Sequence, residues 1–270
     1  MPELPEVETI VRCLRRPLRY RTVVSASLRP AALYRKGSLR VGVLTGRAIA
    51  GVERAGKNAV FRFDPPAVMV VNLGMTGQLL LHPSCGRLPG ASARHLHGRF
   101  ALDGGTELRY YDIRRFGFIF VTREKDVPAV LGIGPDPFDA EASYLSEKLK
   151  GREAPIKTLL LDQRILSGVG NIYADEMLFD AGIDPRRSGG SVVRRAEALL
   201  SSARRILKSA IVHKGSTIRD YRRPDGSRGG FQHLHAVYAR KGEPCVRCGE
   251  PVRKIVLGGR GTHFCPVCQS

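Results

Sequence analysis

Pro2 and Glu3 form a pair that could carry out nucleophilic chemistry. We expect Met1 to be removed, because a small second residue normally permits removal, and Pro2 would then carry a free secondary amine. An α-amine has a pKa of roughly 8, so a useful fraction is neutral and can attack an electrophilic carbon to form a Schiff base. Glu3 could exchange protons beside it. Taken alone, the pair is explained better as the start of a helix, the role that we expect of Pro5.

Four cysteines near the C-terminus have the spacing of a metal site. Cys245-Val-Arg-Cys248 is followed by sixteen residues and then by Cys265-Pro-Val-Cys268. Two such pairs are typical of a zinc ribbon, in which four thiolates hold one tetrahedral Zn²⁺. Redox or disulfide pairs are disfavoured, because the acidic N-terminus does not resemble a secretory signal. We expect Cys13 to be a core thiol and Cys85 to be a loop residue.

The charge indicates a polyanionic partner. The 270 residues include 44 Lys and Arg against 25 Asp and Glu, a formal net charge of +19. From residue 186 onward there are 18 basic and 5 acidic residues, so +13 of that charge lies in the last third. Such a surplus is typical of nucleic-acid binding. A membrane is disfavoured, because we find no apolar run of about 20 residues. The lack of Trp favours duplex DNA over a stacked single strand.

Short segments rich in β-branched and aromatic residues predict an N-terminal β-sandwich. Gly, Pro or Asp separates these segments, as is usual between strands. The first helix, with Val7, Ile10, Val11 and Leu14 on one face, is expected to flank the sandwich. The expected strands are residues 22–28, 58–63, 68–73, 78–82, 99–102, 107–111 and 118–121.

The rest of the chain predicts helices followed by the zinc ribbon. Gly and Pro mark a linker at residues 132–137, and apolar spacing predicts a helix over residues 191–212. Residues 214–230 are Gly-rich and are expected to form a loop. We therefore predict an α+β multidomain chain. Its parts would be a catalytic β-sandwich domain at residues 1–131, a helical DNA-binding domain at 132–235 and a zinc-ribbon hairpin at 236–270.

Five motifs follow one another along essentially the whole chain. They are Pro2-Glu-Leu-Pro-Glu-Val-Glu8, Asn72-Leu-Gly-Met-Thr-Gly77, Asp112-Ile-Arg-Arg-Phe-Gly117, Gly168-Val-Gly-Asn-Ile-Tyr-Ala-Asp-Glu176 and Gly258-Gly-Arg-Gly-Thr-His-Phe-Cys265. Together they resemble the formamidopyrimidine-DNA glycosylase family, also called the MutM family. The resemblance implies that the helical domain has a helix-two-turns-helix fold and that one structural Zn²⁺ is the cofactor.

The resemblance implies a monomeric, bacterial-type repair enzyme of the cytoplasm and its nucleoid. It would remove oxidised purines, chiefly 8-oxoguanine and formamidopyrimidines, from double-stranded DNA and cut abasic sites by β,δ-elimination. Pro2 would attack C1′ of the damaged nucleoside, and Glu3 would handle protons at the sugar. Glu6 could shape the same pocket, although a first-turn Glu also stabilises a helix N-terminus.

The resemblance also assigns residues that would hold DNA. Met75 and Phe116 would fill the gap left by a flipped base, and Arg114 would pair with the orphaned base. Without the resemblance, Met75 and Phe116 would be expected in the core. Further DNA contacts are expected at Lys57, His97, Lys157, Asn171 and Arg260, with Lys57 and Arg260 close to the chemistry, and Thr217 and Arg219 would lie in a loop that covers the flipped base. Asn171 also suits a helix N-cap.

Two alternatives stay open at this point. The endonuclease VIII branch shares the fold and the nucleophile but prefers oxidised pyrimidines; Pro5 and the Met75, Arg114 and Phe116 set favour the purine branch. A non-enzymatic zinc-ribbon DNA-binding protein explains the charge and the cysteines, but it has no use for Pro2 and Glu3. Asn72 departs from the His that we expect in many relatives, which bears on lesion preference.

Overall fold

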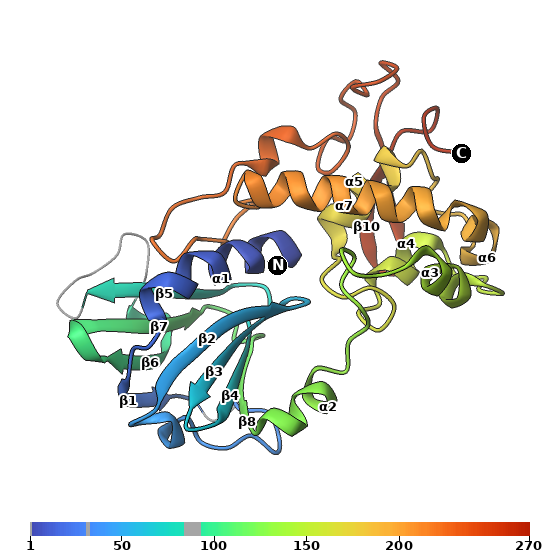
Figure 1. Ribbon diagram of the computed structural model, residues 1–270. Helices are drawn as coiled ribbons and strands as arrows, with labels where there is room; N and C mark the ends of the chain where they lie inside the picture. Colours follow the sequence, from blue (N-terminus) through green and yellow to red (C-terminus); the bar gives the residue numbers. More distant parts are fainter. Residues whose placement is uncertain (1, 31–32, 84–92) are drawn as a thin grey trace. The chain divides into compact units, whose positions relative to one another are not determined.

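The computed structural model describes residues 2–30, 33–83 and 93–270, so Cys85 lies outside the described residues. They form two compact units (Figure 1). The N-terminal unit comprises Met1–Gly132 and His213–Gly230, and the C-terminal unit comprises Ile133–Val212 and Phe231–Ser270. The division into three parts at residues 131 and 235 stays a prediction. Within the described ranges, no helix has the length and apolar character needed to cross a membrane.

Two four-stranded antiparallel sheets build the N-terminal unit (Figure 1). In spatial order, the first contains β1 (Val23–Leu28), β6 (Leu96–Leu102), β7 (Thr106–Asp112) and β5 (Gly77–Pro83). The second contains β2 (Ala48–Ala55), β3 (Asn58–Asp64), β4 (Ala67–Asn72) and β8 (Phe118–Thr122). The sandwich predicted from the sequence is therefore confirmed, and each predicted strand overlaps an observed one.

The prediction missed strand β2. Its sequence, Ala-Ile-Ala-Gly-Val-Glu-Arg-Ala, places Gly51 and two charged residues among few β-branched ones. A shift of register between Ile49 and Gly51 also breaks the alternation of inward and outward residues. Pairing with β3 supplies the hydrogen bonds that local propensity does not indicate, so tertiary context decides this strand.

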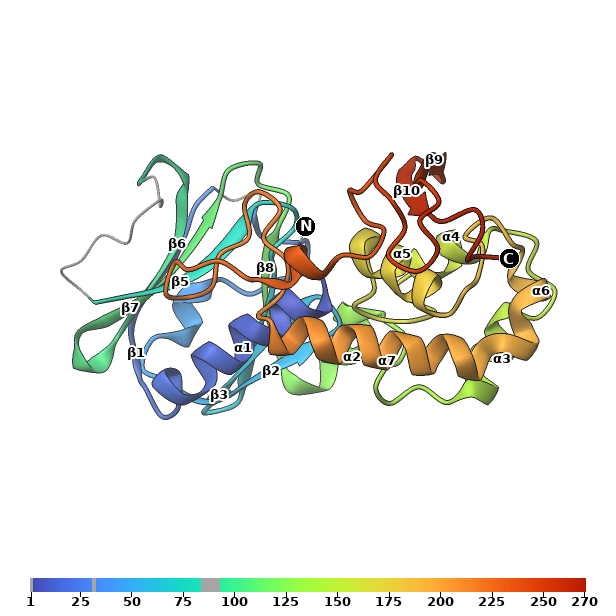
Figure 2. The same cartoon turned by 90° about the horizontal axis from the view of Figure 1, so that it is seen from above.

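Helix α1 (Leu4–Leu18) supplies one wall of the N-terminal core. Its side chains at Val7, Ile10, Val11 and Leu14 are fully buried, as the helical spacing predicts. They join one apolar cluster with residues of both sheets, Phe61 among them. The short helix α2 (Val127–Leu131) contributes to a second cluster that includes β3, β4 and β8 residues. Figure 2 shows α1 lengthwise beside strand β2.

Helices and one hairpin form the C-terminal unit. They are α3 (Ala142–Leu149), α4 (Ile156–Leu161), α5 (Asn171–Asp180), α6 (Gly189–Val192), α7 (Ala196–Val212), β9 (Arg253–Leu257) and β10 (Arg260–Phe264). The helix predicted at 191–212 begins at Ala196 instead, because α6 and a 3-10 turn at Val193–Arg195 occupy the residues before it. The N-terminal unit contains 3-10 turns at Val41–Leu44, Ala93–His95, Asp103–Gly105 and Glu124–Asp126, and the C-terminal unit contains another at Phe231–Leu234.

Candidate active site and zinc hairpin

The N-terminal peptide is held at the start of α1. Glu3 is the N-cap residue and is only 2% exposed, and Pro2 is also buried. Glu3 and Glu6 form a capping box, in which the backbone N–H of Glu3 donates to Glu6 Oε2 over 2.8 Å. The bond fixes the backbone that carries the candidate nucleophile and its neighbouring carboxylate.

Lys57 lies in the tight turn between β2 and β3, and its side chain is half-buried. Gly56 takes a positive φ of 57° in this turn, and Asn58 Nδ2 donates to the Ala55 carbonyl over 3.0 Å. On the preceding strand, Arg54 forms an ion pair with Glu8 of α1, with Nε and Oε2 3.0 Å apart. This turn is therefore tied to the same helix that begins at the N-terminal peptide.

Two connections that pass from one sheet to the other lie side by side. One, residues 73–76, joins β4 to β5; the other, residues 113–117, joins β7 to β8. Because Gly77 pairs with Asp112 and Asn72 pairs with Phe118, both connections leave the sheets at the same place. A Cβ built on Gly74 would lie 2.5 Å from the backbone of Gly117, so the two backbones nearly touch.

Asp112 joins these two connections. Its fully buried carboxylate accepts hydrogen bonds from the Thr76 hydroxyl (2.5 Å) and the backbone N–H groups of Arg114 (3.2 Å) and Gly117 (2.9 Å). The Tyr110 hydroxyl also donates to it, over 3.1 Å. Burial is the main cause that raises the Tyr110 pKa well above its usual value, and the negative charge of Asp112 is the second. The connections are therefore anchored from inside the unit.

The three predicted wedge residues come together on these connections. The Arg114 guanidinium lies 4.4 Å from the centre of the Phe116 ring, and its Nη1 is 3.4 Å from Met75 Sδ. Phe116 is 57% exposed and Met75 is half-buried, so the alternative that both belong to the core is wrong for Phe116. An exposed aromatic ring stacked on an arginine is suited to contact nucleic-acid bases.

Two further polar side chains support the same connections. His97 Nε2 lies 2.9 Å from the backbone carbonyl of Asp112, and the ring is half-buried. Asn72 accepts a hydrogen bond from Gly74 N–H and donates to Asn58 Oδ1, each over 2.9 Å. Asn72 therefore orients the turn that carries Met75.

The predicted covering loop belongs to the N-terminal unit as residues 213–230. Thr217 is buried; its hydroxyl donates to the Tyr221 carbonyl (3.3 Å) and accepts from Gly229 N–H (2.9 Å). Arg219 is exposed. Thr217 thus holds the loop closed upon itself, whereas Arg219 is accessible to a ligand.

The four ribbon cysteines converge on one point. Their sulfur atoms all lie within 4.8 Å of one another, with Cys245 and Cys268 3.9 Å apart and Cys248 and Cys265 3.5 Å apart. A tetrahedral Zn²⁺ with Zn–S bonds of about 2.3 Å places its sulfurs about 3.8 Å apart. The set therefore fits one structural zinc ion. Cys13, by contrast, is half-buried on α1, with its sulfur 4.0 Å from Arg223 Nη2.

Arg260 is presented at the end of the β9–β10 hairpin. Gly258 and Gly259 form its turn with φ values of 53° and 72°, a conformation that favours glycine at both positions. Arg260 pairs with Leu257 directly after the turn, and its side chain is exposed. The guanidinium is therefore available to grip a phosphate.

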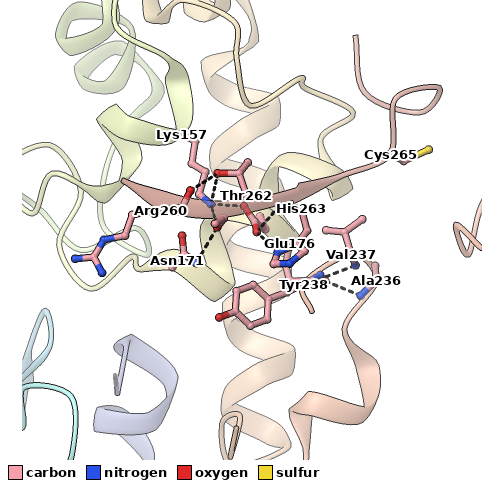
Figure 3. A network of polar contacts seen from close by, with 12 residues as sticks. Lys157, Asn171, Glu176, Ala236, Val237, Tyr238, Arg260, Thr262, His263 and Cys265 are labelled. Carbon is pink, nitrogen blue, oxygen red and sulfur yellow. Dashed lines mark hydrogen bonds and ion pairs between the residues drawn. The ribbon is translucent and has the colours of Figure 1, made fainter. Parts of the chain in front are cut away.

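Lys157 is a correction to the sequence prediction (Figure 3). It is fully buried, so its ammonium group cannot reach a DNA phosphate. Nζ forms an ion pair with Asp175 Oδ1 (2.7 Å) and donates to the Gly261 carbonyl (2.9 Å) and the Thr262 hydroxyl (2.8 Å). Lys157 therefore fixes the strand that follows Arg260.

Asn171 is the first residue of α5, and Gly170 rather than Asn171 is the N-cap. The N-cap expectation is therefore wrong, because the Asn171 side chain turns to the hairpin instead, where Nδ2 donates to the Gly261 carbonyl over 3.0 Å. That carbonyl thus accepts from both Lys157 and Asn171 (Figure 3). The contact brings Asn171 next to the residue that follows Arg260 in the chain.

Two neighbouring carboxylates of α5 complete this network. Asp175 accepts from His263 N–H over 2.9 Å, and Glu176 accepts from three backbone N–H groups at Ala236, Val237 and Tyr238 (2.9, 3.0 and 2.8 Å; Figure 3). Burial raises the pKa of Glu176 although these bonds oppose the shift. Sequence reasoning assigned no role to Asp112, Asp175 or Glu176. Their position inside the quoted motifs was the available signal.

The zinc site predicts a stoichiometry and a local dependence. Purified protein should contain one zinc per chain, and Cys248→Ala should lose it and unfold the hairpin, because structural zinc contributes directly to folding. The N-terminal unit should remain folded. Metal analysis and circular dichroism would measure both effects, with Cys13→Ala as the control that keeps its zinc. Soluble, folded protein without zinc would contradict the assignment.

Lys157→Met should destabilise the C-terminal unit by about 3 kcal/mol, because it removes the ammonium partner of the buried Asp175 carboxylate. Denaturant unfolding would measure the loss. The exposed Lys150→Met variant removes the same charge from the surface and should change stability by less than about 0.5 kcal/mol. Equal stability of the two variants would contradict the structural role of Lys157.

Comparison with known proteins gives consistent matches along the chain. Residues 1–119 match the formamidopyrimidine-DNA glycosylase N-terminal domain, residues 131–222 the H2TH domain of the same glycosylase, and residues 242–270 a zinc finger found in FPG and IleRS. Formamidopyrimidine-DNA glycosylase from Thermus thermophilus is 43% identical over 277 residues, which cover 100% of this chain and 98% of the relative. The Bacillus cereus enzyme is 40% identical over 278 residues, covering 100% and 99%.

Solved structures agree. The crystal structure of the Thermus thermophilus MutM (FPG) protein has a TM-score of 0.87 at 42% identity, covering 99% of this chain and 98% of that one. A mutant Lactococcus lactis FPG in complex with Fapy-dG containing DNA has a TM-score of 0.90 at 35% identity, with both chains fully covered. The Lactococcus lactis Fpg bound to abasic-site DNA has a TM-score of 0.88 at 34% identity, covering 99% of each chain. The chain belongs to the formamidopyrimidine-DNA glycosylase family.

Proposed function

We propose that this chain excises oxidised purines from duplex DNA and then cuts the strand at the abasic site, with the Pro2 amine as nucleophile. The observation that carries the proposal is the placement of Pro2 and Glu3 at the buried start of α1, in a chain that matches the family from end to end. Solved relatives bound to Fapy-dG and abasic-site DNA support this substrate class.

The proposed chemistry uses two groups of this chain. The neutral Pro2 amine attacks C1′ of the damaged nucleoside, the C1′–N bond breaks, and the base leaves with a proton. Ring opening gives an iminium that acidifies the C2′ proton, and loss of that proton expels the 3′ phosphate. Loss of a second proton, from C4′ of the resulting conjugated iminium, then expels the 5′ phosphate. Glu3 accepts and returns protons at the sugar.

The remaining site residues would hold and open the duplex. We assign Met75, Arg114 and Phe116 to the gap in the base stack, since their side chains already contact one another on an exposed connection. Arg260 and Asn171 would bind phosphate beside the zinc hairpin, Lys57 and His97 would contact the DNA near the site, and Arg219 would approach the flipped base. The formal charge of +19 supports duplex binding.

The relatives are bacterial, which supports a role at the bacterial chromosome in the cytoplasm. We assign the working form to a single chain, as the resemblance to the family implies.

Blocking the N-terminus tests the nucleophile. A retained Met1, an N-terminal extension or acetylation should abolish excision and strand cleavage, because the amine is no longer free, while duplex binding persists. With the free N-terminus, borohydride should trap a covalent protein–DNA adduct at the N-terminal peptide. The same extension at the C-terminus is the matched control. Full-rate cleavage by a blocked chain would show that Pro2 is not the nucleophile, and Lys57 would be the next residue to test.

Phe116→Ala and Arg260→Ala should separate base flipping from phosphate binding. Phe116→Ala should slow lesion excision more than cleavage of abasic-site DNA, where no intact base must be extruded. Arg260→Ala should weaken all duplexes alike and lower the salt slope by about one unit. Gel-shift and single-turnover assays at several salt concentrations measure both. Equal losses on both substrates for Phe116→Ala would remove it from the wedge.

A further inference from the structure

Glu6 joins the N-terminal peptide to a segment more than two hundred residues later in the chain. Its side chain is 1% exposed. Oε2 accepts from Glu3 N–H over 2.8 Å, while Oε1 accepts from Ser216 N–H over 2.7 Å. Hydrogen bonds to an ionised carboxylate are about twice as strong as neutral ones. One carboxylate therefore fixes both the peptide of the proposed nucleophile and the start of the predicted covering loop.

The backbone of residues 213–230 is shaped to reach this carboxylate. Gly215 has a φ of +77°, and a Cβ there would lie 2.7 Å from Glu6 Oε1, so a side chain would push the two apart. A Cβ on Gly229 would lie 2.5 Å from the Lys214 carbonyl. Gly230 N–H donates to the His213 carbonyl over 2.8 Å and closes the base of the loop. Glycines at these close approaches let both ends of the segment meet beside Glu6.

Tyr221 anchors the other side of the same turn. Its hydroxyl lies 3.1 Å from the Lys214 carbonyl and 3.5 Å from the Glu6 carbonyl, and its ring belongs to the main core cluster. Burial, and then the charge of Glu6, raises the Tyr221 pKa well above its usual value. Gln78 of β5 donates to the Asp220 carbonyl over 2.7 Å. In Figures 1 and 2 this segment passes beside α1 and β5.

The exposed tip of the segment lies between these anchors. Ile218 is 47% exposed and Arg219 is exposed, whereas Ser216 and Tyr221 on either side are 3% and 6% exposed. The backbone position of the tip therefore depends on the Glu6–Ser216 bond on one side and on the core-packed Tyr221 on the other. Loss of the first anchor loosens the start of the tip, which the Thr217 hydroxyl and Tyr221 then hold alone, without removing any group that touches the sugar.

We infer that Glu6 is a positioning residue that sets the conformation of residues 214–221 and thereby the recognition of the damaged base. The inference rests on the proposed function, since it assumes that this segment meets the flipped base. It differs from a purely local role for Glu6 as a helix cap. Loss of a helix cap would lower the stability of the protein and so affect its reaction with every substrate equally. Loss of the anchor should matter mainly for substrates in which a damaged base must be held.

Glu6→Gln and Gly215→Ala test the anchor from both sides. Glutamine keeps the shape but turns an N–H₂ group toward one of the two backbone donors, whereas the alanine methyl pushes residue 215 away from a carboxylate that can still accept from Glu3 N–H. Each should slow 8-oxoguanine or Fapy-dG excision about tenfold, the effect of one charge-assisted hydrogen bond. Gly215→Ala should change abasic-site cleavage less than about threefold, whereas Glu6→Gln should slow it as well, because Glu6 also holds the N-terminal peptide. Backbone hydrogen exchange at residues 214–221 should accelerate in both. Glu8→Gln, whose carboxylate pairs with Arg12 and Arg54 instead, is the matched control and should leave that exchange unchanged.

The outcomes separate this inference from the proposed function. Unchanged exchange at residues 214–221 overturns the anchor whatever the activity, and so does equal loss on lesion and abasic-site DNA in Gly215→Ala. Accelerated exchange together with selective loss of excision supports it. A wild-type chain with a free N-terminus that acts on neither substrate would instead refute the proposed function, while the exchange result would still decide whether Glu6 holds the segment.

Discussion

Asp112 carries a carboxylate into the interior of the N-terminal unit and accepts hydrogen bonds there from both connections that join the two sheets. Antiparallel strands satisfy their own backbone groups, but a connection between sheets leaves N–H groups without ladder partners. The carboxylate supplies those partners and closes the gap between the two connections. It is the buried group on which the support of Met75, Arg114 and Phe116 converges.

Buried carboxylates accept backbone N–H groups at other places in the chain as well. Glu6 accepts N–H groups from the N-terminal peptide and from residue 216, Glu176 from residues 236–238, and Asp175 from the hairpin strand at His263. A carboxylate that accepts several backbone N–H groups is compensated for its burial. These carboxylates are therefore buried although the chain as a whole is basic, and Lys and Arg supply much of its exposed charge.

The zinc hairpin is held at both ends by different chemistry. The four cysteines define its base, while Lys157 and Asn171 fix the Gly261 carbonyl next to its tip. Arg260 is thus a flexible side chain on a rigid support. Such support reduces the ordering cost of phosphate binding, because only the arginine side chain must be immobilised. Lys157 and Arg260 are both basic residues, but burial gives Lys157 a structural role, whereas exposure leaves Arg260 available to a phosphate.

By itself, the sequence determined the features that depend on local spacing. The cysteine pairs, the Gly-Gly turn before Arg260, the apolar face of α1 and most strands follow from residues close together in the chain. Tertiary structure decided the rest. Strand β2 depends on pairing with β3, Lys157 on burial against Asp175, Asn171 on a carbonyl 90 residues away, and Glu6 on a partner 210 residues away. Burial and long-range hydrogen bonds are properties of neighbours in space, and local sequence does not name those neighbours.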